Sequence, residues 1–378
     1  MAVPRTVLLA NPGADLYGSD RMLLESVRAL VRAGHRVYVT VPERGPLVEL
    51  VRDAGAVALT QPTPILRKSA MSIAGLVRLG VGAFSSWGSA WRLIRQVDPA
   101  TVLVNTITEP LWLLLGRLAG RRVVCHVHEA ERSIPPGIRR LIYLPLTLCH
   151  SIVVNSATSL DVVKEVAPRL GRRAHIVHNA VAGPDVMVPA RVDLTGPVRV
   201  LYVGRLSRRK GPHVAIEATR LLLEHGRWVH LTLIGAVFPG NEAYEEELQR
   251  LVRQWGLEDH VTWLGFQSRV WSHIAECDIM VVPSTGDESF GNTSVEALLA
   301  ARPVIISDAA GLREATAMAK ACLETAGGDA HALACAVLEI IDRWHYFRKH
   351  AKEDSRRLGQ HFSRENYSRN LLTAMQLC

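Results

Sequence analysis

The segment GRLSRRKG, residues 204–211, places four cationic side chains within eight residues. It follows VRVLYV, residues 198–203, which has the apolar, β-branched composition of a buried strand. Arg presents a planar fork of donors and Lys a compact point charge, and together they suit a diphosphate. A solvated basic loop is the alternative interpretation. The position of the segment at the carboxyl end of a strand favours an anion-binding role.

A second stretch, DESFGNTSVEALLAARPV, covers residues 287–304 and holds Glu288 and Glu296 on either side of a loop-to-helix junction. Thr293 and Glu296 have the spacing of a helix capping box, which gives Glu296 a purely structural alternative. Capping does not account for Glu288 or for the Phe-Gly-Asn turn at residues 290–292. We therefore expect Glu288 and this turn to face a ligand.

Two histidines and a glutamate end the segment RVVCHVHE, residues 122–129. The segment lacks the H-E-x-x-H spacing of a helical zinc site, and a zinc site needs a further ligand nearby. If the strand runs to Val127, His126 lies within it and His128 lies at its carboxyl end. That position makes His128 a candidate functional residue.

The loop NPGADLYGSD, residues 11–20, joins the first predicted strand to the first predicted helix. Its glycines permit close approach of the backbone to a ligand, and the helix N-terminus offers N–H groups to an anion. The loop is not G-x-G-x-x-G, so the dinucleotide fingerprint is absent. Ser19 or Asp20 is expected to cap the helix.

Short apolar runs predict strands that alternate with helices along the chain. In the N-terminal half these runs are residues 6–10, 35–41, 101–105, 122–127 and 151–155. In the C-terminal half they are residues 198–203, 230–234, 261–264, 279–282 and 303–307. Near-continuous apolar strands between helices indicate parallel sheets covered on both faces. The predicted fold class is α/β, with two doubly wound, Rossmann-like domains facing a cleft.

A longer segment between the second predicted strand, residues 35–41, and the third, residues 101–105, carries apolar side chains on one helical face. These side chains are Ile73, Leu76, Val77, Val81, Phe84, Trp87, Trp91 and Ile94. The pattern predicts a helix packed on the core, with a membrane-surface helix as the alternative. No uninterrupted apolar run reaches 18 residues, so no membrane-spanning helix is expected.

Residues 180–197, AVAGPDVMVPARVDLTGP, are rich in Pro, Gly and Asp and have no helical period, which predicts a linker. We expect an N-terminal domain over residues 1–185 and a C-terminal domain over residues 186–360. A chain of 378 residues is long enough for both.

Composition and charge narrow the function classes. The chain is 48% apolar and 21% charged, which excludes a disordered or fibrous protein, and its 6% aromatic content disfavours a protein that stacks nucleic-acid bases. Residues 1–185 carry 22 Lys and Arg against 13 Asp and Glu, whereas the remaining residues carry 22 against 23. The excess reflects plain Arg usage, or a surface for anionic lipid or a phosphate-bearing substrate. Nucleic acid is a third option, which the basic residues do not favour because they are spread singly and in pairs.

The six cysteines are scattered without a C-x-x-C pair, which predicts neither a zinc site nor a disulfide framework. The four-residue apolar run near Met1 is too short for a signal peptide. We therefore expect a cytoplasmic protein, with peripheral contact to the inner face of the membrane as an extension of that expectation.

Taken together, these stretches resemble the retaining, nucleotide-sugar-dependent glycosyltransferases of family 4, which have the GT-B fold. The resemblance runs through nearly the whole chain, from the loop at Gly18 to RPVIISDAAGLREA at residue 302 and a last helix at residues 362–375. It implies that the first domain binds the acceptor, that the second binds the nucleotide sugar, and that a terminal helix over residues 361–378 crosses back to the first domain.

The resemblance also implies roles for single residues. Arg205 and Lys210 hold the donor diphosphate and stabilise the leaving-group charge, so that neither a metal nor a cofactor is required. Glu288 contacts hydroxyls of the transferred sugar, and Glu296 binds the ribose hydroxyls. His128 lies beside the donor sugar and the acceptor. The catalytic set implied is His128, Arg205, Lys210 and Glu288.

Further donor-binding residues follow from the same resemblance. Gly18 and Ser19 line the phosphate side, and Phe266 and Gln267 lie where the base rests. The backbone along the sugar and phosphate belongs to four consecutive residues, Phe290, Gly291, Asn292 and Thr293.

The implied reaction moves a sugar, with retention, from a nucleotide-diphosphate sugar (UDP-sugar by family habit) to a saccharide or lipid-linked acceptor. Its implied setting is the synthesis of cell-surface polysaccharide, glycolipid or glycoconjugate. The chain departs from the family in having Gly18-Ser19 for Gly-Gly, Asn179-Ala180-Val181 for Asn-Gly-Val, and Ala301 for Gly. None of these departures removes a charged group.

Two other functions remain open at this point. The first is a nucleotide-sugar 2-epimerase of the GT-B fold. The second is a non-catalytic protein that binds a membrane or nucleic acid through its basic first domain. A transferase of this family is not expected to bind nucleic acid, whereas contact with an anionic membrane is compatible with it.

Overall fold

The computed structural model describes residues 3–66 and 73–377. The chain divides into two compact units: Met1–Ala180 together with Arg364–Cys378 form the first, and Val181–Ser363 form the second. The chain therefore passes into the second unit slightly before residue 185, the expected boundary, and returns to the first slightly after residue 361.

The first unit is built on a seven-stranded sheet in the order β3-β2-β1-β4-β5-β6-β7, and its strands are all parallel. The strands are β1 (Thr6–Ala10), β2 (Arg36–Val41), β3 (Val57–Thr60), β4 (Thr101–Asn105), β5 (Arg122–Val127), β6 (Ser151–Val154) and β7 (Ala174–Ile176). The helices are α1 (Gly18–Arg32), α2 (Pro46–Asp53), α3 (Ile73–Val97), α4 (Pro110–Leu118), α5 (Pro136–Tyr143), α6 (Ala157–Val166), the short η2 (Leu144–Leu148) and η3 (Leu170–Arg173), and α14 (Arg364–Met375).

Alternation along β1 supplies both cores of this unit. Val7 and Leu9 belong to the cluster on the side of α1, α2 and α14. Leu8 and Ala10 belong to the cluster on the other side of the sheet, with Ile94 of α3. A strand buried on both faces has no polar side to expose, which explains its continuous apolar sequence.

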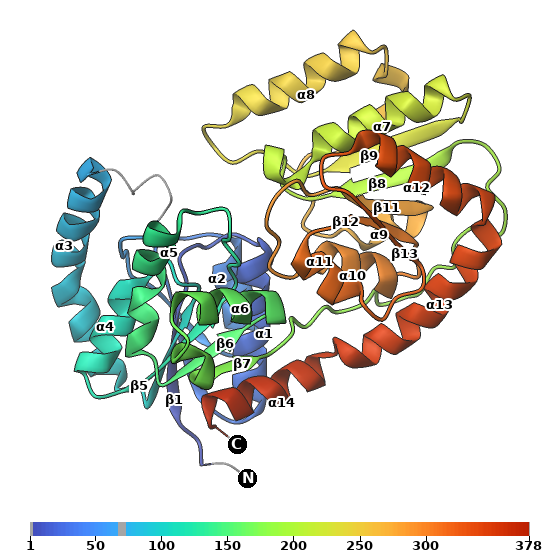
Figure 1. The fold of residues 1–378 in the computed structure, drawn as a ribbon. Helices are drawn as coiled ribbons and strands as arrows, with labels where there is room; N and C mark the ends of the chain where they lie inside the picture. Colours follow the sequence, from blue (N-terminus) through green and yellow to red (C-terminus); the bar gives the residue numbers. More distant parts are fainter. Residues whose placement is uncertain (1–2, 67–72, 378) are drawn as a thin grey trace. The chain divides into compact units, whose positions relative to one another are not determined.

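Helix α14 completes the first unit although it comes from the end of the chain (Figure 1). The hydroxyls of Tyr367 and Ser26 lie 2.6 Å apart. Ser151 Oγ donates to the carbonyl of Ala374 at 2.7 Å. These contacts tie α14 to α1 and β6.

The second unit has a six-stranded sheet in the order β10-β9-β8-β11-β12-β13, again with parallel strands. The strands are β8 (Val198–Val203), β9 (Val229–Ile234), β10 (Val261–Trp263), β11 (Ile279–Val282), β12 (Val304–Ser307) and β13 (Cys322–Thr325). The helices are η4 (Arg208–Lys210), α7 (Pro212–Glu224), α8 (Glu242–Gln254), η5 (Glu258–His260), α9 (Trp271–Glu276), α10 (Asn292–Leu299), α11 (Ala310–Thr316), α12 (Ala330–Asp342) and α13 (Trp344–His361).

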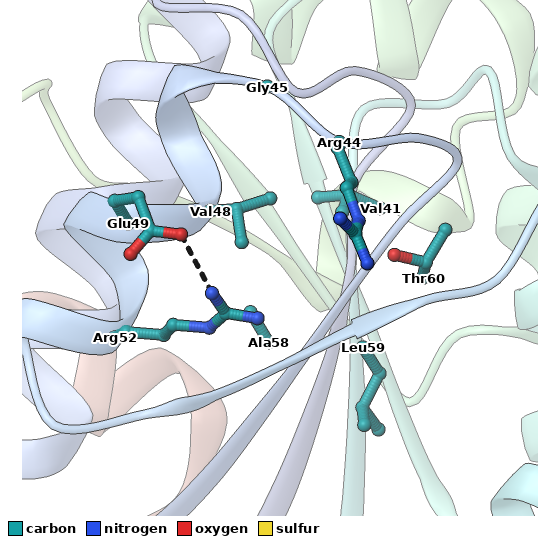
Figure 2. Close-up of a pocket in the computed structure, with 9 residues that line it drawn as sticks. All are labelled: Val41, Arg44, Gly45, Val48, Glu49, Arg52, Ala58, Leu59 and Thr60. Atoms are coloured by element: carbon teal, nitrogen blue, oxygen red, sulfur yellow. Dashed lines mark hydrogen bonds and ion pairs between the residues drawn. The ribbon is translucent and has the colours of Figure 1, made fainter.

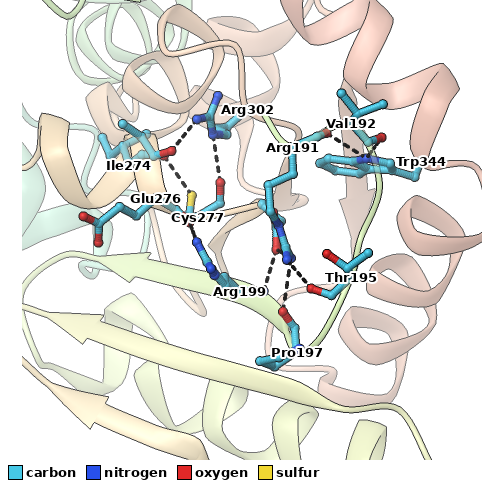
Figure 3. A network of polar contacts seen from close by, with 12 residues as sticks. Arg191, Val192, Thr195, Pro197, Arg199, Ile274, Glu276, Cys277, Arg302 and Trp344 are labelled. Atoms are coloured by element: carbon cyan, nitrogen blue, oxygen red, sulfur yellow. Dashed lines mark hydrogen bonds and ion pairs between the residues drawn. The ribbon is translucent and has the colours of Figure 1, made fainter. Parts of the chain in front are cut away.

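The linker predicted at residues 180–197 has no helix or strand, yet polar contacts fasten it to the second unit (Figure 3). Arg191 Nε donates to Asp278 Oδ1 at 2.9 Å. Trp344 Nε1 donates to the carbonyl of Val192 at 3.0 Å. Arg302, which is fully buried, donates to the carbonyls of Cys277 at 2.8 Å and Val188 at 3.1 Å.

The ten strands predicted from apolar runs are present, with ends shifted by at most a residue. Three edge strands were not predicted: β3, β7 and β13. Their residues are largely half-exposed, so their sequences lack the continuous apolar character that marks a central strand. The five cysteines in the described part of the chain are all free.

Helix α1 begins differently from the prediction. It starts at Gly18, after Tyr17 at the N-cap position. Neither Ser19 nor Asp20 occupies the cap; instead Asp20 reaches back from the first turn, and its Oδ2 accepts the backbone N–H of Tyr17 at 3.1 Å. A carboxylate in the first turn is favourable because the helix N-terminus carries partial positive charge.

The prediction that α3 packs its apolar face on the core is largely wrong. Ala90 and Ile94 are buried, but Val77, Val81 and Phe84 are 61%, 65% and 86% exposed. The side chains of Ile73 and Leu76, also in the predicted face, lie outside the described part of the structure. Among the described residues, no helix is both long enough and apolar enough to span a membrane.

Candidate active site

Most of the residues singled out from the sequence follow a strand that flanks the point where its sheet reverses its strand order. His128 follows β5, and Phe266 and Gln267 follow the edge strand β10. In the second unit the reversal lies between β8 and β11, and in the first between β1 and β4. Ligands of open α/β sheets bind outside the carboxyl ends of strands at such a switch point.

In the second unit, three loops are joined at the carboxyl ends of β8, β9 and β10. The backbone N–H of Leu206 donates to Ala236 O at 3.0 Å, and that of Gly235 donates to Gly265 O at 2.8 Å. A Cβ on Gly235 would lie 1.8 Å from Gly204 O, so only glycine permits this approach.

The basic loop also contacts the loop that follows β11. Gly211, at φ +70°, ends η4 and precedes α7. A Cβ on Gly211 would lie 1.9 Å from the carbonyl oxygen of Pro283. The backbone N–H of Thr285 donates to Arg209 O at 2.8 Å. The two loops that flank the switch point are thus held against each other through their backbones.

Lys210 and Glu288 meet across this contact. Lys210 Nζ lies 2.7 Å from Glu288 Oε1, and Arg209 Nη1 lies 3.3 Å from the same oxygen. Ser284 Oγ donates to Glu288 Oε1 at 2.7 Å. The Glu288 side chain is 7% exposed, whereas that of Lys210 is 26% exposed. The structure therefore brings together two residues that the sequence singled out 78 positions apart.

Glu288 stays ionised in this setting. Burial alone would raise its pKa, but the charges of Lys210 and Arg209 and the hydrogen bonds from Lys210 and Ser284 outweigh burial, so the pKa lies below its ordinary value. A buried carboxylate that has three donors on one oxygen still has a second oxygen with which to accept hydrogen bonds from a ligand.

Arg205 lies on the same loop, next to an aromatic ring that the sequence analysis did not single out. Its guanidinium carbon lies 3.4 Å from the centroid of the Phe238 ring. The hydroxyl of Tyr202 donates to the carbonyl of Arg205 at 2.9 Å. Stacking on an aromatic face and a fixed backbone restrict where the guanidinium can point.

The turn before α10 differs from a capping box. Gly291 occupies the N-cap position, Thr293 lies inside the helix, and no side chain caps it. The capping alternative for Glu296 is therefore wrong, and Glu296 lies one turn inside α10, 9% exposed. Phe290 is 1% exposed and packs edge-on against Phe362, with ring centroids 5.5 Å apart. Only the backbone of Phe290 is left to contact a ligand.

Phe266 and Gln267 follow β10 at the same edge of the sheet. Phe266 is 50% exposed. Gln267 Nε2 donates to the carbonyl of Leu264 at 2.7 Å, which holds its side chain against the loop. Phe266 thus lies half-exposed in the loop that contains Gly265.

In the first unit, a chain of amide side chains links His128 to the start of α1. Asn105, the last residue of β4, accepts at Oδ1 from His128 Nε2, 2.8 Å away. Its Nδ2 donates to Asn11 Oδ1 at 2.7 Å and to Ser19 O at 3.0 Å. Asn11 Nδ2 in turn donates to Asp20 Oδ1 at 2.9 Å. His128 and Ser19, both predicted site residues, are brought together through Asn105, with Gly18 beside Ser19.

The two histidines at the carboxyl end of β5, His126 within it and His128 just after it, are held neutral. The rings of His126 and His128 lie 4.0 Å apart between centroids. Burial lowers the pKa of His128 to about 3, and burial, with the nearby charge of His128, lowers that of His126. Burial raises the pKa of the adjacent Glu129 to about 7.

A pocket of about 240 Å³ lies at the other edge of the first sheet, between α2 and the ends of β2 and β3 (Figure 2). Its lining residues are Val41, Arg44, Gly45, Val48, Glu49, Arg52, Ala58, Leu59 and Thr60. Glu49 and Arg52, one turn apart on α2, form an ion pair at 2.7 Å along one side of it. None of the residues predicted from the sequence lines this pocket.

Several residues at these sites, five polar and one aromatic, were missed by the sequence analysis as individual site residues. They are Asn11, Asp20, Asn105, Arg209, Phe238 and Ser284. Asn11 directly follows β1, Asn105 ends β4 and Ser284 lies two residues after β11, and for these three that position was the available signal. Within residues 3–66 and 73–377, no group of three or more His, Cys, Asp or Glu side chains is arranged to hold a metal ion.

Family models match both units. The model described as Glycosyltransferase Family 4 matches residues 17–182, and that described as Glycosyl transferases group 1 matches residues 191–358. Among curated relatives, the glycogen synthase of Mycobacterium tuberculosis is 30% identical over 56% of this chain and 50% of its own length. The chain thus spans about half the length of that relative. The 2-deoxystreptamine glucosyltransferase of Streptomyces kanamyceticus is 25% identical over 85% of this chain and 88% of its own length.

Solved structures share the whole fold. Anabaena HepE, solved with UDP and glucose, matches with a TM-score of 0.81 and 19% identity over 99% of this chain and 100% of its own. Sucrose-phosphate synthase of Thermosynechococcus elongatus matches with a TM-score of 0.75 and 18% identity over 98% of both chains. With matches to both units and along the full fold, the chain belongs to the glycosyltransferases of family 4 and has their GT-B fold of two Rossmann-like domains.

Proposed function

We propose that the protein is a retaining, metal-independent glycosyltransferase that moves a sugar from a nucleotide-diphosphate sugar to a saccharide or lipid-linked acceptor. The observation that carries this proposal is the Lys210–Glu288 pair at 2.7 Å, on the two loops that flank the switch point of the second sheet. In this proposal the cation serves a phosphate of the donor, and the carboxylate beside it serves the sugar hydroxyls.

The chemistry follows from where charge develops. When the bond between the anomeric carbon and the diphosphate breaks, negative charge grows on the β-phosphate, and fixed cations at that point lower the barrier. Lys210 and Arg205 supply this stabilisation, with no metal taking part. Glu288, which is ionised, accepts hydrogen bonds from the sugar hydroxyls and thereby positions the sugar.

Retention without an enzyme nucleophile places the acceptor on the face that the leaving group departs from. The departing phosphate oxygen then takes the proton of the acceptor hydroxyl. His128 assists as a neutral side chain beside the sugar. Its pKa of about 3 excludes an imidazolium from the reaction near neutral pH.

A UDP-sugar is the proposed donor, because HepE, which shares this fold, was also solved with UDP-glucose. Phe266 offers its exposed ring to the base. The proposed setting is cell-surface polysaccharide, glycolipid or glycoconjugate synthesis in the cytoplasm. Peripheral contact between the basic first unit and an anionic membrane belongs to the same proposal, and a lipid-linked acceptor would require it.

The experiment is a thermal-shift panel with UDP, GDP, dTDP and ADP on the wild type and two variants. A nucleotide at about 100 times its dissociation constant should add about 2.7 kcal/mol of stability. Lys210→Ala should abolish the shift. Arg208→Ala is the matched control, because Arg208 lies on the same loop but pairs outward with Glu247. Equal shifts in all three proteins, or none in the wild type, would contradict the donor site.

Turnover separates transfer from the alternatives. With a UDP-sugar and an acceptor library, Lys210→Ala and Glu288→Gln should each lose about 10²–10³-fold in rate, while Arg208→Ala keeps its rate. The product's anomeric configuration, read by NMR, must equal that of the donor. Recovery of an epimerised nucleotide sugar would establish the epimerase instead, and intact activity in Glu288→Gln would remove Glu288 from the mechanism.

A further inference from the structure

Helix α3 exposes an apolar row that no other part of the described chain covers. Val77, Val81 and Phe84 follow one another at helical spacing and are 61%, 65% and 86% exposed. On the opposite side, Ala90 and Ile94 near the end of the helix are buried, and α3 packs on α4 at the outside of the first unit (Figure 1). The first half of the helix is therefore apolar on the side that faces away from the protein, which a surface helix normally avoids.

The same outward row becomes basic toward the end of the helix. At 100° per residue, Arg92 and Arg95 fall within about 60° of the direction of Val77, and both are exposed. Trp87, 37% exposed, lies at the margin of the row. No Asp or Glu occurs anywhere between Asp53 and Asp98, a stretch that holds five Lys and Arg.

This combination suits one kind of partner. An exposed aliphatic and aromatic row flanked by cations, without a single acid, matches an anionic lipid surface: apolar side chains enter the acyl boundary and cations meet lipid phosphates. The excess of 22 basic over 13 acidic residues in residues 1–185 points the same way. A protein partner would have to supply a complementary acidic groove, whereas an anionic bilayer supplies both features together.

We propose that α3 is the membrane-docking element of this protein, lying in the interface of an anionic bilayer with Phe84 among the acyl chains and Arg92 and Arg95 at the phosphates. This inference rests on the membrane part of the proposed function and assigns it to one helix. It does not depend on the donor site, because α3 contains none of the residues proposed to bind the nucleotide sugar.

The test is co-sedimentation of the full chain with vesicles of phosphatidylglycerol and phosphatidylcholine, and with vesicles of phosphatidylcholine alone, at low salt. Wild type should sediment with the anionic vesicles only. Val81→Ser/Phe84→Ser should weaken binding about tenfold or more, through lost apolar burial. Arg92→Gln/Arg95→Gln should weaken it roughly thirtyfold, since each cation near an anionic surface contributes about fivefold.

The matched control is Trp228→Ser, which removes an aromatic side chain that is 62% exposed in the second unit and should leave vesicle binding unchanged.

Vesicle binding of wild-type strength in either α3 variant would overturn the assignment to α3 while leaving membrane contact in place. Absence of wild-type binding to anionic vesicles, or equal binding to both vesicles, would overturn the lipid proposal. A concentration-dependent dimer that the Val81→Ser/Phe84→Ser variant loses would assign the row to a second copy of the chain. The UDP thermal shift must persist in every α3 variant, which separates failure here from failure at the donor site.

Discussion

The Nε2 atom of His128 lies 2.8 Å from the Oδ1 atom of Asn105. The other hydrogen bonds of Asn105 decide which ring nitrogen of His128 carries the proton. The Nδ2 of Asn105 donates to Asn11 and to the carbonyl of Ser19, so its oxygen must face the histidine. Asp20, which only accepts when ionised, orients Asn11 in the same way. Nε2 of His128 is therefore the donor, and Nδ1 is left as an acceptor.

We predict that His128 is neutral with its proton on Nε2 and presents Nδ1 to a hydroxyl donor such as a sugar. Nitrogen-15 NMR of histidine-labelled protein should show this tautomer, unchanged from about pH 5 to 8 because its pKa is about 3. Titration of this ring near pH 6.5, or protonation on Nδ1, would contradict the prediction.

Asn105→Ala supplies the complementary test. Without the amide oxygen the preference for Nε2 is lost, and His128 should populate both tautomers. The substitution should lower kcat by a larger factor than it raises KM, because a mispositioned His128 no longer stabilises the transition state. His175, which lies on the edge strand β7, provides an internal reference whose spectrum should not change. An unaltered His128 tautomer in Asn105→Ala would show that Asn105 does not position it.

The Lys210–Glu288 and Asn11–Asn105 contacts have the same topological origin, and this explains how far the sequence could predict the site. Each joins the loop after the first strand of a unit to the loop, or last residue, of the strand across the reversal in order. Apolar runs of central strands predict that both ends meet at one edge of a parallel sheet. Arg205, Lys210, Glu288 and His128 could be picked out because charged residues follow such runs.

Other features depend on tertiary packing that no local pattern reports. In the sequence Asn105 is only the last residue of a predicted strand. Its role becomes visible once its neighbour on the adjacent strand's loop, Asn11, is known. Phe238 is one aromatic in a loop, and its role is visible only under Arg205. For α3, periodicity finds an apolar face but cannot say whether it meets the core or the outside, and only Ala90 and Ile94 are buried.

Gly211→Ala should be far more harmful than Gly226→Ala, although the two glycines have nearly the same φ, +70° and +72°. A Cβ on Gly226 meets nothing within 4 Å, so alanine there costs only the left-handed conformation, about 1 kcal/mol. At Gly211 the Cβ would also lie 1.9 Å from Pro283 O. The loops must part, which should lower Tm further and abolish the UDP shift. Similar melting and UDP binding in the two variants would show that the loop contact is dispensable.

Asp278→Ala should destabilise the second unit by about 3–5 kcal/mol, because it leaves Arg191 without its buried partner. Asp278 is 1% exposed, accepts from Arg191 Nε at 2.9 Å, and also accepts the backbone N–H of Arg199 at 2.8 Å. The control is Asp342→Ala, which breaks an exposed pair with Arg227 and should cost no more than about 1 kcal/mol. Chemical denaturation, followed by fluorescence, measures both. Equal losses would mean that the linker is not anchored through Asp278.

Glu109→Gln should make the protein more stable, and increasingly so as pH rises from about 4.5 to 8. Glu109 is 1% exposed; Thr63 donates to its Oε1 at 2.8 Å, and its Oε2 has no hydrogen-bond partner in the described part of the chain. Burial raises the pKa of Glu109 to about 8, with the Thr63 hydrogen bond acting in the opposite direction. Between the unfolded and folded pKa values of Glu109, the unfolded chain has lost a proton that the folded protein keeps, so the stability of the wild type falls by up to about 1.4 kcal/mol per pH unit.

Glutamine at position 109 keeps the shape of the side chain and does not titrate. The gain in Tm over wild type should therefore grow up to about pH 8 and then stay constant. Parallel Tm profiles for Glu109→Gln and wild type from pH 5 to 9 would show that Glu109 is ionised in the folded protein.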